Sequence, residues 1–167
     1  IESFKANGQY FNTQPYIVDQ ATGQIIKTEK ATPEIKTSTV AAPFYASSSS
    51  SWMMKGERSN VRLNSNGGFN FVIKMAPGLD PESIIKLVRF DLLKRSRRDP
   101  SRDRHMPSMK TTGSWGGASS EQVTENDVQI EIKWLSDGVY EIIPRSGMAS
   151  GEYAFYIMHK FYAFGID

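Results

Sequence analysis

The stretch GEYAFYIMHKFYAFGID, residues 151–167, decides the fold class of this chain. Two runs of aromatic and small residues flank a Met158-His159-Lys160 tip, which predicts a β-hairpin with His159 on the surface. Both faces of its strands are largely apolar, and such strands are not expected to face water on either side. The hairpin is expected to pair near the strand 128–134. Either it is central in its sheet and covered on its second face by the N-terminal arm, or that face is an oligomer contact.

Other segments show the alternation and the turn residues of antiparallel strands. Residues 16–18 and 25–28 flank Thr22-Gly23, a turn at which glycine adopts positive φ without steric cost. Residues 34–40 are rich in β-branched side chains, and residues 69–75 place apolar side chains at every second position. These segments predict a hairpin followed by two further strands.

The second half of the chain continues this pattern. Residues 128–134 alternate, with Val128 and Trp134 on the same apolar face. Ser136-Asp137-Gly138 then turns the chain into a return strand over 139–143. A second hairpin is therefore predicted immediately before the terminal one.

Four segments are expected to lie outside long strands. Asp80-Pro81-Glu82-Ser83 combines a capping residue, a proline in the first turn and an early acid, which predicts one helical turn near 80–86. The run 46–51, with five consecutive serines, is expected to form a loop. The charged segment 94–106 and the Gly- and Ser-rich segment 111–120 are expected to be loops as well.

These elements predict an all-β fold of eight to ten short strands. Each strand hides one face and needs a second sheet to hide it against, so an antiparallel β-sandwich is expected, immunoglobulin-like or jelly-roll-like. Residues 1–51 would supply an N-terminal arm and the first strands, packed on the same domain, and residues 52–167 the sandwich core. The 167 residues suit a single domain overall.

Composition narrows the class of protein. The chain has no cysteine, which excludes disulfides, thiolate chemistry and cysteine-ligated metals. Its apolar runs are far shorter than the roughly 20 residues that span a bilayer, so no transmembrane segment is expected. Many Ser, Thr, Gly and Asn residues together with short β segments favour an exported protein, in the periplasm, on the outer surface or secreted.

Four motifs occur in a characteristic order: SNVRL at 59–63, DPESIIKL at 80–87, GEYAF at 151–155 and a closing FGID at 164–167. In this order the chain resembles exported bacterial β-sandwich proteins for which no activity is established. The resemblance covers about residues 59–167. It implies a sandwich fold and export, and it carries no functional residues over to this chain.

A basic loop is the main electrostatic feature of the sequence. Between Lys86 and Lys110 nine Lys or Arg residues face three Asp, a local charge of +6 in a chain of net charge +2. Arginine binds phosphates and carboxylates bidentately, so the loop 94–105 is a candidate site for an anionic polymer, which means nucleic acid, a glycan or a lipid headgroup. The candidate binding residues are Lys94, Arg95, Arg97, Arg98, Arg102 and Arg104, with Trp115 as a stacking residue.

The alternative for this loop is a solvated connection between two strands. Asp99 and Asp103 offer internal partners to its arginines, and exposed charge pairs usually contribute little. Single-strand binders interleave aromatic residues for base stacking, and this loop has none, so nucleic acid is not favoured.

The sequence contains no specific motif for catalysis or for metal binding. Neither His105 nor His159 has a second ligand at metal-binding spacing, and no Gly-x-Ser-x-Gly elbow occurs. The carboxylates Glu121, Glu125 and Asp127 lie in a segment that reads as a solvated turn. We therefore expect no catalytic residue, no metal and no cofactor.

The sequence thus predicts a non-catalytic exported or cell-envelope β-sandwich module with an interaction or structural role. Its partner would be a protein or a glycan, or a second copy bound through the terminal hairpin. The first alternative is anionic-polymer binding through the loop 94–105. The second is a hydrolase of envelope or carbohydrate material, which requires a pocket holding two or more ionisable groups.

Overall fold

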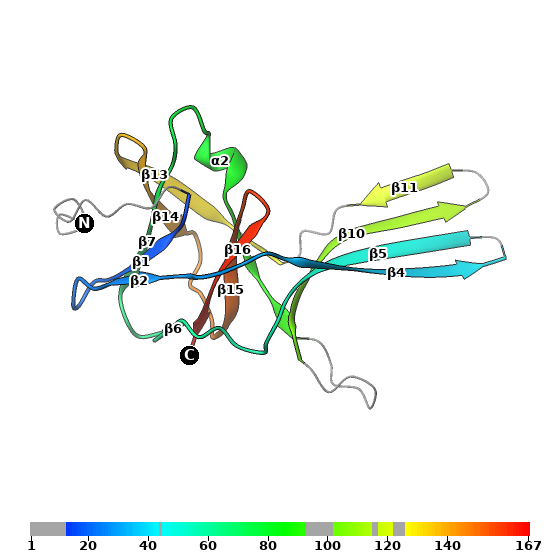
Figure 1. Ribbon diagram of the computed structural model, residues 1–167, viewed down its shortest axis with the longest axis horizontal. Helices are drawn as coiled ribbons and strands as arrows, with labels where there is room; N and C mark the ends of the chain where they lie inside the picture. Colours follow the sequence, from blue (N-terminus) through cyan, green and yellow to red (C-terminus); the bar gives the residue numbers. More distant parts are fainter. Residues whose placement is uncertain (1–12, 44, 93–101, 115–116, 122–125) are drawn as a thin grey trace.

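The computed structural model describes residues 13–43, 45–92, 102–114, 117–121 and 126–167. Strands hold 56% of the chain and helix 3%, and the sheets are antiparallel apart from one short parallel pair between β6 and β16. The predicted all-β sandwich is therefore confirmed (Figure 1).

Sheet A has five strands in the order β13-β14-β7-β1-β2. They are β13 (Ile130–Ser136), β14 (Val139–Pro144), β7 (Phe69–Lys74), β1 (Tyr16–Asp19) and β2 (Ile25–Lys27). Both hairpins predicted in this sheet are confirmed. Each turns through a glycine with positive φ, Gly23 at 69° and Gly138 at 72°.

Sheet B contains the terminal hairpin and has the order β12-β8-β15-β16-β3, with β6 alongside β16. Its strands are β12 (Asp127–Val128), β8 (Lys86–Arg89), β15 (Gly151–Ile157), β16 (Lys160–Ile166), β3 (Glu29–Ala31) and β6 (Arg62–Leu63). The hairpin is central in its sheet, with β15 and β16 each paired on both sides. Its neighbours are β8 and β3 rather than the strand 128–134, which pairs with β14 in sheet A.

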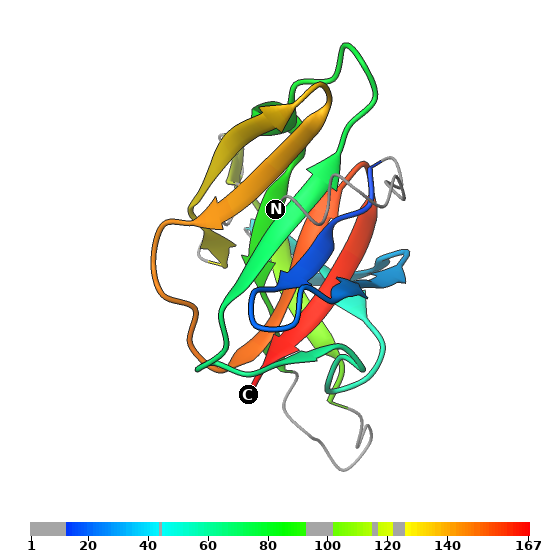
Figure 2. The ribbon, with the colours of Figure 1, turned by 90° about the vertical axis from the view of Figure 1, so that its left-hand side faces the viewer.

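The main core fills the space between sheets A and B. Phe71 of β7 packs edge-on against Phe155 of β15, with ring centroids 5.0 Å apart, and against Phe164 of β16 at 4.9 Å. All three side chains are at most 1% exposed. Burying each contributes about 1.5–3 kcal/mol relative to exposure, so this aromatic contact joins the two layers of the sandwich. Figure 2 shows sheet A and the terminal hairpin as successive layers.

The second face of the hairpin is also buried, because a second core lies behind it. Ala154 and Phe161 are fully buried there against Phe90, Met54 and Met106. Met54 and Met106 come from the strands β5 and β10 of a third sheet. The sequence predicted burial of this face, and among the described residues its cover is the root of the third sheet within the same chain.

Sheet C projects from the sandwich as a single layer, on the far side of sheet B from sheet A (Figure 1). Its order is β11-β10-β5-β4, with β9 (Asp91–Leu92) paired to the root of β10. Its other strands are β4 (Glu34–Ala42), β5 (Tyr45–Met54), β10 (Arg104–Ser114) and β11 (Gly117–Glu121). At about 3.4 Å per residue, β5 and β10 are roughly 35 Å long.

Sheet C overturns three loop predictions. The serine run 46–51 lies in β5, the segment 104–106 begins β10, and most of 111–120 lies in β10 and β11. Serine has low intrinsic β propensity, but β5 has a partner strand on each side, and the two ladders of backbone hydrogen bonds impose the extended conformation. The boundary drawn between residues 51 and 52 falls inside β5.

Two further expectations differ in detail. The described residues form sixteen strands rather than eight to ten, because single residues such as Thr28, Phe90 and Gln129 interrupt runs that the sequence presents as continuous. Trp134 stays in register with Ile130 and Ile132 on β13, but its side chain is 62% exposed, so the cover of this face ends before Trp134. The predicted helical turn is confirmed as α2 (Pro81–Ile84), capped by the Asp80 side chain.

Candidate interaction site at the root of the projecting sheet

Arg104 is the first residue of β10 and lies at the root of sheet C, where it is 1% exposed. Its guanidinium donates to both carboxylate oxygens of Glu29, at 3.2 and 3.3 Å. It also donates to the backbone carbonyls of Lys55 at 2.8 Å and Gly56 at 3.0 Å. The planar fork of an arginine suits this arrangement, because it satisfies a carboxylate and two carbonyls at once.

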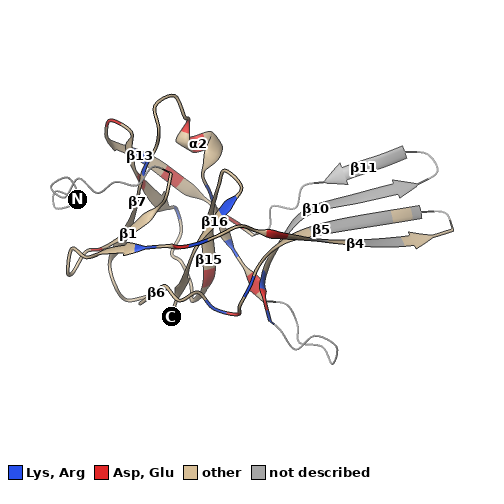
Figure 3. Cartoon of the chain, in the orientation of Figure 1, with Lys and Arg blue, Asp and Glu red and all other residues tan. Residues whose placement is uncertain are grey.

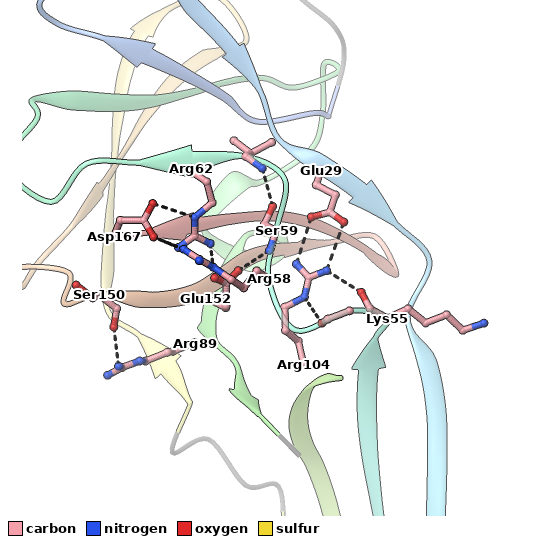
Figure 4. Close-up of polar contacts among 12 residues, drawn as sticks. Glu29, Lys55, Arg58, Ser59, Arg62, Arg89, Arg104, Ser150, Glu152 and Asp167 are labelled. Atoms are coloured by element: carbon pink, nitrogen blue, oxygen red, sulfur yellow. Dashed lines mark hydrogen bonds and ion pairs between the residues drawn. The ribbon is translucent and has the colours of Figure 1, made fainter. Parts of the chain in front are cut away.

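Glu29 of β3 is held as an anion by this contact. Burial raises the pKa of Glu29, but hydrogen bonds from Arg104 and Ser59 and the charge of Arg104 lower it by more, so it lies below the ordinary value of 4.5. The pair therefore ties β3 of sheet B to β10 of sheet C through a charged contact that is mostly shielded from water (Figure 4).

A second charged cluster continues from the first along the same segment. Arg62 of β6 pairs with Glu152 of β15 and, bidentately, with the Asp167 side chain. Arg58 reaches Asp167 as well, at 2.5 Å. Hydrogen bonds from Arg62 lower the pKa of Asp167, and the bond to Asp167 raises the pKa of Arg62.

Ser59 connects the two clusters and is 3% exposed. Its backbone N–H donates to Glu152 at 2.7 Å, while its side chain contacts Glu29. The segment 55–62 is thus held by Arg104 of sheet C at its start and by sheet B from Ser59 onward (Figure 4). We call the residues Glu29, Ser59, Arg62, Arg104, Glu152 and Asp167 the root network.

An open cleft of about 680 Å³ lies beside the root network. It is lined by Glu57, Arg58, Arg89, Phe90, Asp91, Leu92, Asn126, Gly151 and Glu152. Three of these are carboxylates, and each accepts from a neighbouring donor: Glu152 from Arg62, Glu57 from Arg102 at 3.1 Å, and Asp91 from Asn126 at 3.2 Å. The cleft therefore holds ionisable groups of both signs.

Arg89 lines this cleft and contacts a backbone carbonyl and an aromatic ring. It donates to the Ser150 carbonyl at 3.0 Å and lies over the Tyr153 ring, 5.8 Å from its centroid. This position covers Gly151, where an added Cβ would come within 3.2 Å of the guanidinium. Arg89 therefore packs the end of β15 against β8.

The predicted binding residues fall in different environments. Arg104 is buried in the root network, so it faces the protein and not an external polymer. Arg102 is half exposed and paired with Glu57. Lys94, Arg95, Arg97, Arg98 and Trp115 lie outside the described residues. Figure 3 shows charges of both signs, not one sign, where sheet C meets the sandwich.

The two histidines have local partners. His105 of β10 contacts the Asp91 carbonyl through Nδ1 at 3.0 Å, and His159 contacts the Tyr156 hydroxyl at 3.0 Å. His159 is exposed at the tip of the terminal hairpin, as predicted. No group of three His, Asp or Glu residues in the described part of the chain is arranged to hold a metal.

The distal part of sheet C presents free strand edges. In the described ladders, β4 pairs with β5 alone and β11 with β10 alone. On β4 the described side chains include Ile35, 67% exposed, with Thr37 and Ala41 also exposed. Edge strands carry a row of unpaired backbone N–H and C=O groups, which is a template for pairing with another chain. This edge is therefore the main candidate interaction surface.

Sequence reasoning missed both the root network and the projecting sheet. The members of the network are far apart in the sequence, and Arg104 lies 75 residues from its partner Glu29. The signal that was available is the SNVRL motif, which contains two members of the network, Ser59 and Arg62.

Comparison with protein-family models, with curated proteins and with solved structures finds no match to this chain. No helix among the described residues is long and apolar enough to cross a membrane. The function proposed below is therefore argued from the chain's own residues.

Proposed function

We propose that this chain is a non-catalytic interaction module of the cell envelope or exterior, whose contact element is sheet C. The sandwich serves as a rigid base, and the projecting sheet reaches a partner away from it. The observation that carries the proposal is a long sheet whose two outer strands each have one partner strand among the described residues, and which is anchored at its root by a buried ion pair.

The physical argument concerns what this sheet does for the fold. Met54 and Met106 at its root belong to the second core, but the described side chains farther along β4 are exposed or half-buried. Residues that bury little apolar surface do not repay the entropy of ordering them through the fold alone. A sheet kept extended in this way is accounted for by contacts with another molecule.

The rigid root supports the same proposal. A contact element that swings freely loses orientational entropy on binding, whereas one that is fixed beforehand does not. The Arg104–Glu29 pair and the packing of Met54 and Met106 against Phe161 fix sheet C to sheet B through a charged and an apolar contact. The root network is thus a positioning device for the projecting sheet.

The two alternatives have less support. Two of the residues predicted to bind an anionic polymer are engaged within the protein: Arg104 in the root network and Arg102 with Glu57. Polymer binding therefore stays a prediction for Lys94, Arg95, Arg97 and Arg98. A hydrolase would use the cleft beside the root network, whose carboxylates Glu57, Asp91 and Glu152 are all engaged by donors.

Site-specific photo-crosslinking in the cells that produce the protein tests the proposal. A benzoylphenylalanine placed at Thr37 or Ala41, both exposed on β4, should give discrete adducts. The matched positions Lys86 and Lys133, exposed on the sandwich, should give none. Adducts from the sandwich positions and none from β4 would reject sheet C as the contact element.

Export is part of this proposal and has its own measurement. The absence of cysteine and the abundance of Ser, Thr, Gly and Asn support it. Fractionation followed by immunoblotting should find the chain in the periplasm, on the cell surface or in the medium. Recovery with cytoplasmic markers would contradict export and leave the role of sheet C to the crosslinking result.

A further inference from the structure

The open edges of the described sheets differ greatly in their capacity to pair. The edge strands β2, β3, β11 and β12 have between two and five residues. β13 has seven, but a register shift interrupts it, and it carries Glu131 and Lys133, both exposed. Short strands, irregular pairing and charges are the usual means by which proteins protect an edge.

Among the edge strands described, β4 lacks the first two of these protections, and its two charges, Glu34 and Lys36, are confined to its first three residues. It has nine residues and pairs with β5 over all nine without a register shift. Pro33 and Pro43 bound the strand and do not interrupt it. Ile35, 67% exposed, presents a large apolar side chain on this strand. A straight, uninterrupted edge of this length is the kind that accepts another strand.

We infer that the occupant of this edge is β4 of a second copy of the chain, paired antiparallel across a two-fold axis. This inference rests on the proposed function and names its partner. An antiparallel pair of identical strands obeys two-fold symmetry by construction, so one edge supplies both halves of the interface. The result is a continuous eight-stranded sheet made from two copies of the four-stranded sheet C.

One register uses all nine residues of both strands. It places Ser38 opposite Ser38 of the second copy and Thr37 opposite Thr39, a cross-strand pair that stabilises sheets. Ile35 falls opposite Ala41, so the large exposed side chain meets a small one. The charged residues Glu34 and Lys36 fall opposite Ala42 and Val40, so no like charges meet.

The number of hydrogen bonds in this interface matches that of standard protein–protein interfaces. Nine residue pairs in an antiparallel ladder form about eight to ten backbone hydrogen bonds, because alternate pairs exchange two each. Standard protein–protein interfaces have about ten direct hydrogen bonds. Any other antiparallel register shortens the ladder, and the register that centres on Lys36 also sets lysine opposite lysine.

Disulfide trapping tests the register directly, because the chain has no cysteine of its own. Ser38→Cys should form a crosslinked dimer on mild oxidation of the purified protein, since this position lies opposite itself. Ala41→Cys is the matched control on the same strand. Its counterpart lies six residues along the ladder, about 20 Å away, whereas a disulfide needs Cα atoms within about 7 Å. Mixing Ile35→Cys with Ala41→Cys should restore crosslinking.

A charge design measures the same contact without cysteine. The double variant Thr37→Lys/Thr39→Lys sets lysine opposite lysine twice and should weaken the dimer at least tenfold by light scattering or sedimentation. The variant Thr37→Lys/Thr39→Glu sets lysine opposite glutamate and should keep the dimer. Circular dichroism of both variants checks that the sandwich is intact.

The outcomes separate this inference from the proposed function. A purified chain that stays monomeric at about 100 μM, with Ser38→Cys uncrosslinked, overturns the second copy as partner. Equal trapping of Ser38→Cys and Ala41→Cys overturns the register, because it reflects random collision. If photo-crosslinks from β4 then join another protein, the proposed function stands and only the identity of its partner changes. If β4 gives no adduct either, both are rejected.

Discussion

Replacing Arg104 by methionine removes the charged contact that fixes the projecting sheet to the sandwich. Breaking a buried ion pair by removing one partner costs about 3–5 kcal/mol, since the other charge is left uncompensated. The Glu29 side chain keeps 25% of its exposure and stays partly hydrated, which places the cost near the lower end. The carbonyls of Lys55 and Gly56 each lose a donor, at about 1 kcal/mol apiece, and methionine restores part of the packing. We expect a loss of about 3–4 kcal/mol in the free energy of unfolding.

Urea unfolding followed by tryptophan fluorescence measures this loss, with Trp52 of β5 as a nearby reporter. Arg102→Met is the matched control, because it removes a half-exposed pair with Glu57 and should cost at most about 1 kcal/mol. The double variant Glu29→Gln/Arg104→Met should recover part of the loss, since it leaves no unpaired buried charge. If Arg104→Met costs no more than Arg102→Met, the root network does not anchor the sheet.

The pH dependence of this loss follows from the pKa of Glu29. Its pKa in the folded protein lies below the ordinary value of 4.5. The stability it contributes is therefore fully present above the unfolded pKa and is lost as the pH falls through the folded pKa. The difference between the wild-type protein and Arg104→Met should be constant from pH 8 to about pH 6 and shrink below about pH 4.5. A difference that grows on acidification would contradict the assigned charge state.

Three further predictions concern the sandwich. Gly165→Ala should lower the free energy of unfolding by about 1–3 kcal/mol, because an added Cβ would collide with the Arg62 guanidinium. Gly147→Ala is the control: a Cβ there meets open space, so the variant should be nearly neutral in the same unfolding assay. The turn residues Met158 and His159 have φ of 48° and 64°, so replacing them with Asn-Gly should raise the melting temperature by about 2–4 °C, and a decrease would refute the turn geometry. Trp134→Ser should change the free energy of unfolding by less than about 0.5 kcal/mol, since the side chain is 62% exposed.

The sequence predicts those parts of the fold that local chemistry controls. Alternation over 69–75 and the turns at Gly23 and Gly138 indicate strands and hairpins without reference to the rest of the chain. The terminal hairpin is the clearest case. Apolar residues on both of its faces require cover on both sides, and the structure has a core on each.

The candidate site could not be predicted in the same way. The serine run in β5 has no alternation, and its extended conformation comes from two neighbouring ladders. Arg104 stands among other charged residues that suggest a solvated loop, yet its burial depends on Glu29, which lies 75 residues away. Local pattern contains no information about such a partner.

By itself, then, the amino-acid sequence determined the five strands of sheet A and the double-sided burial of residues 151–167. Both follow from side-chain periodicity and turn chemistry, which act over a few residues. Only the tertiary structure decided that three layers form rather than two, that β4 is an open edge, and that Arg104 is an internal anchor. These depend on which distant strands pair, and each such choice is set by the summed packing and hydrogen bonding of the whole chain.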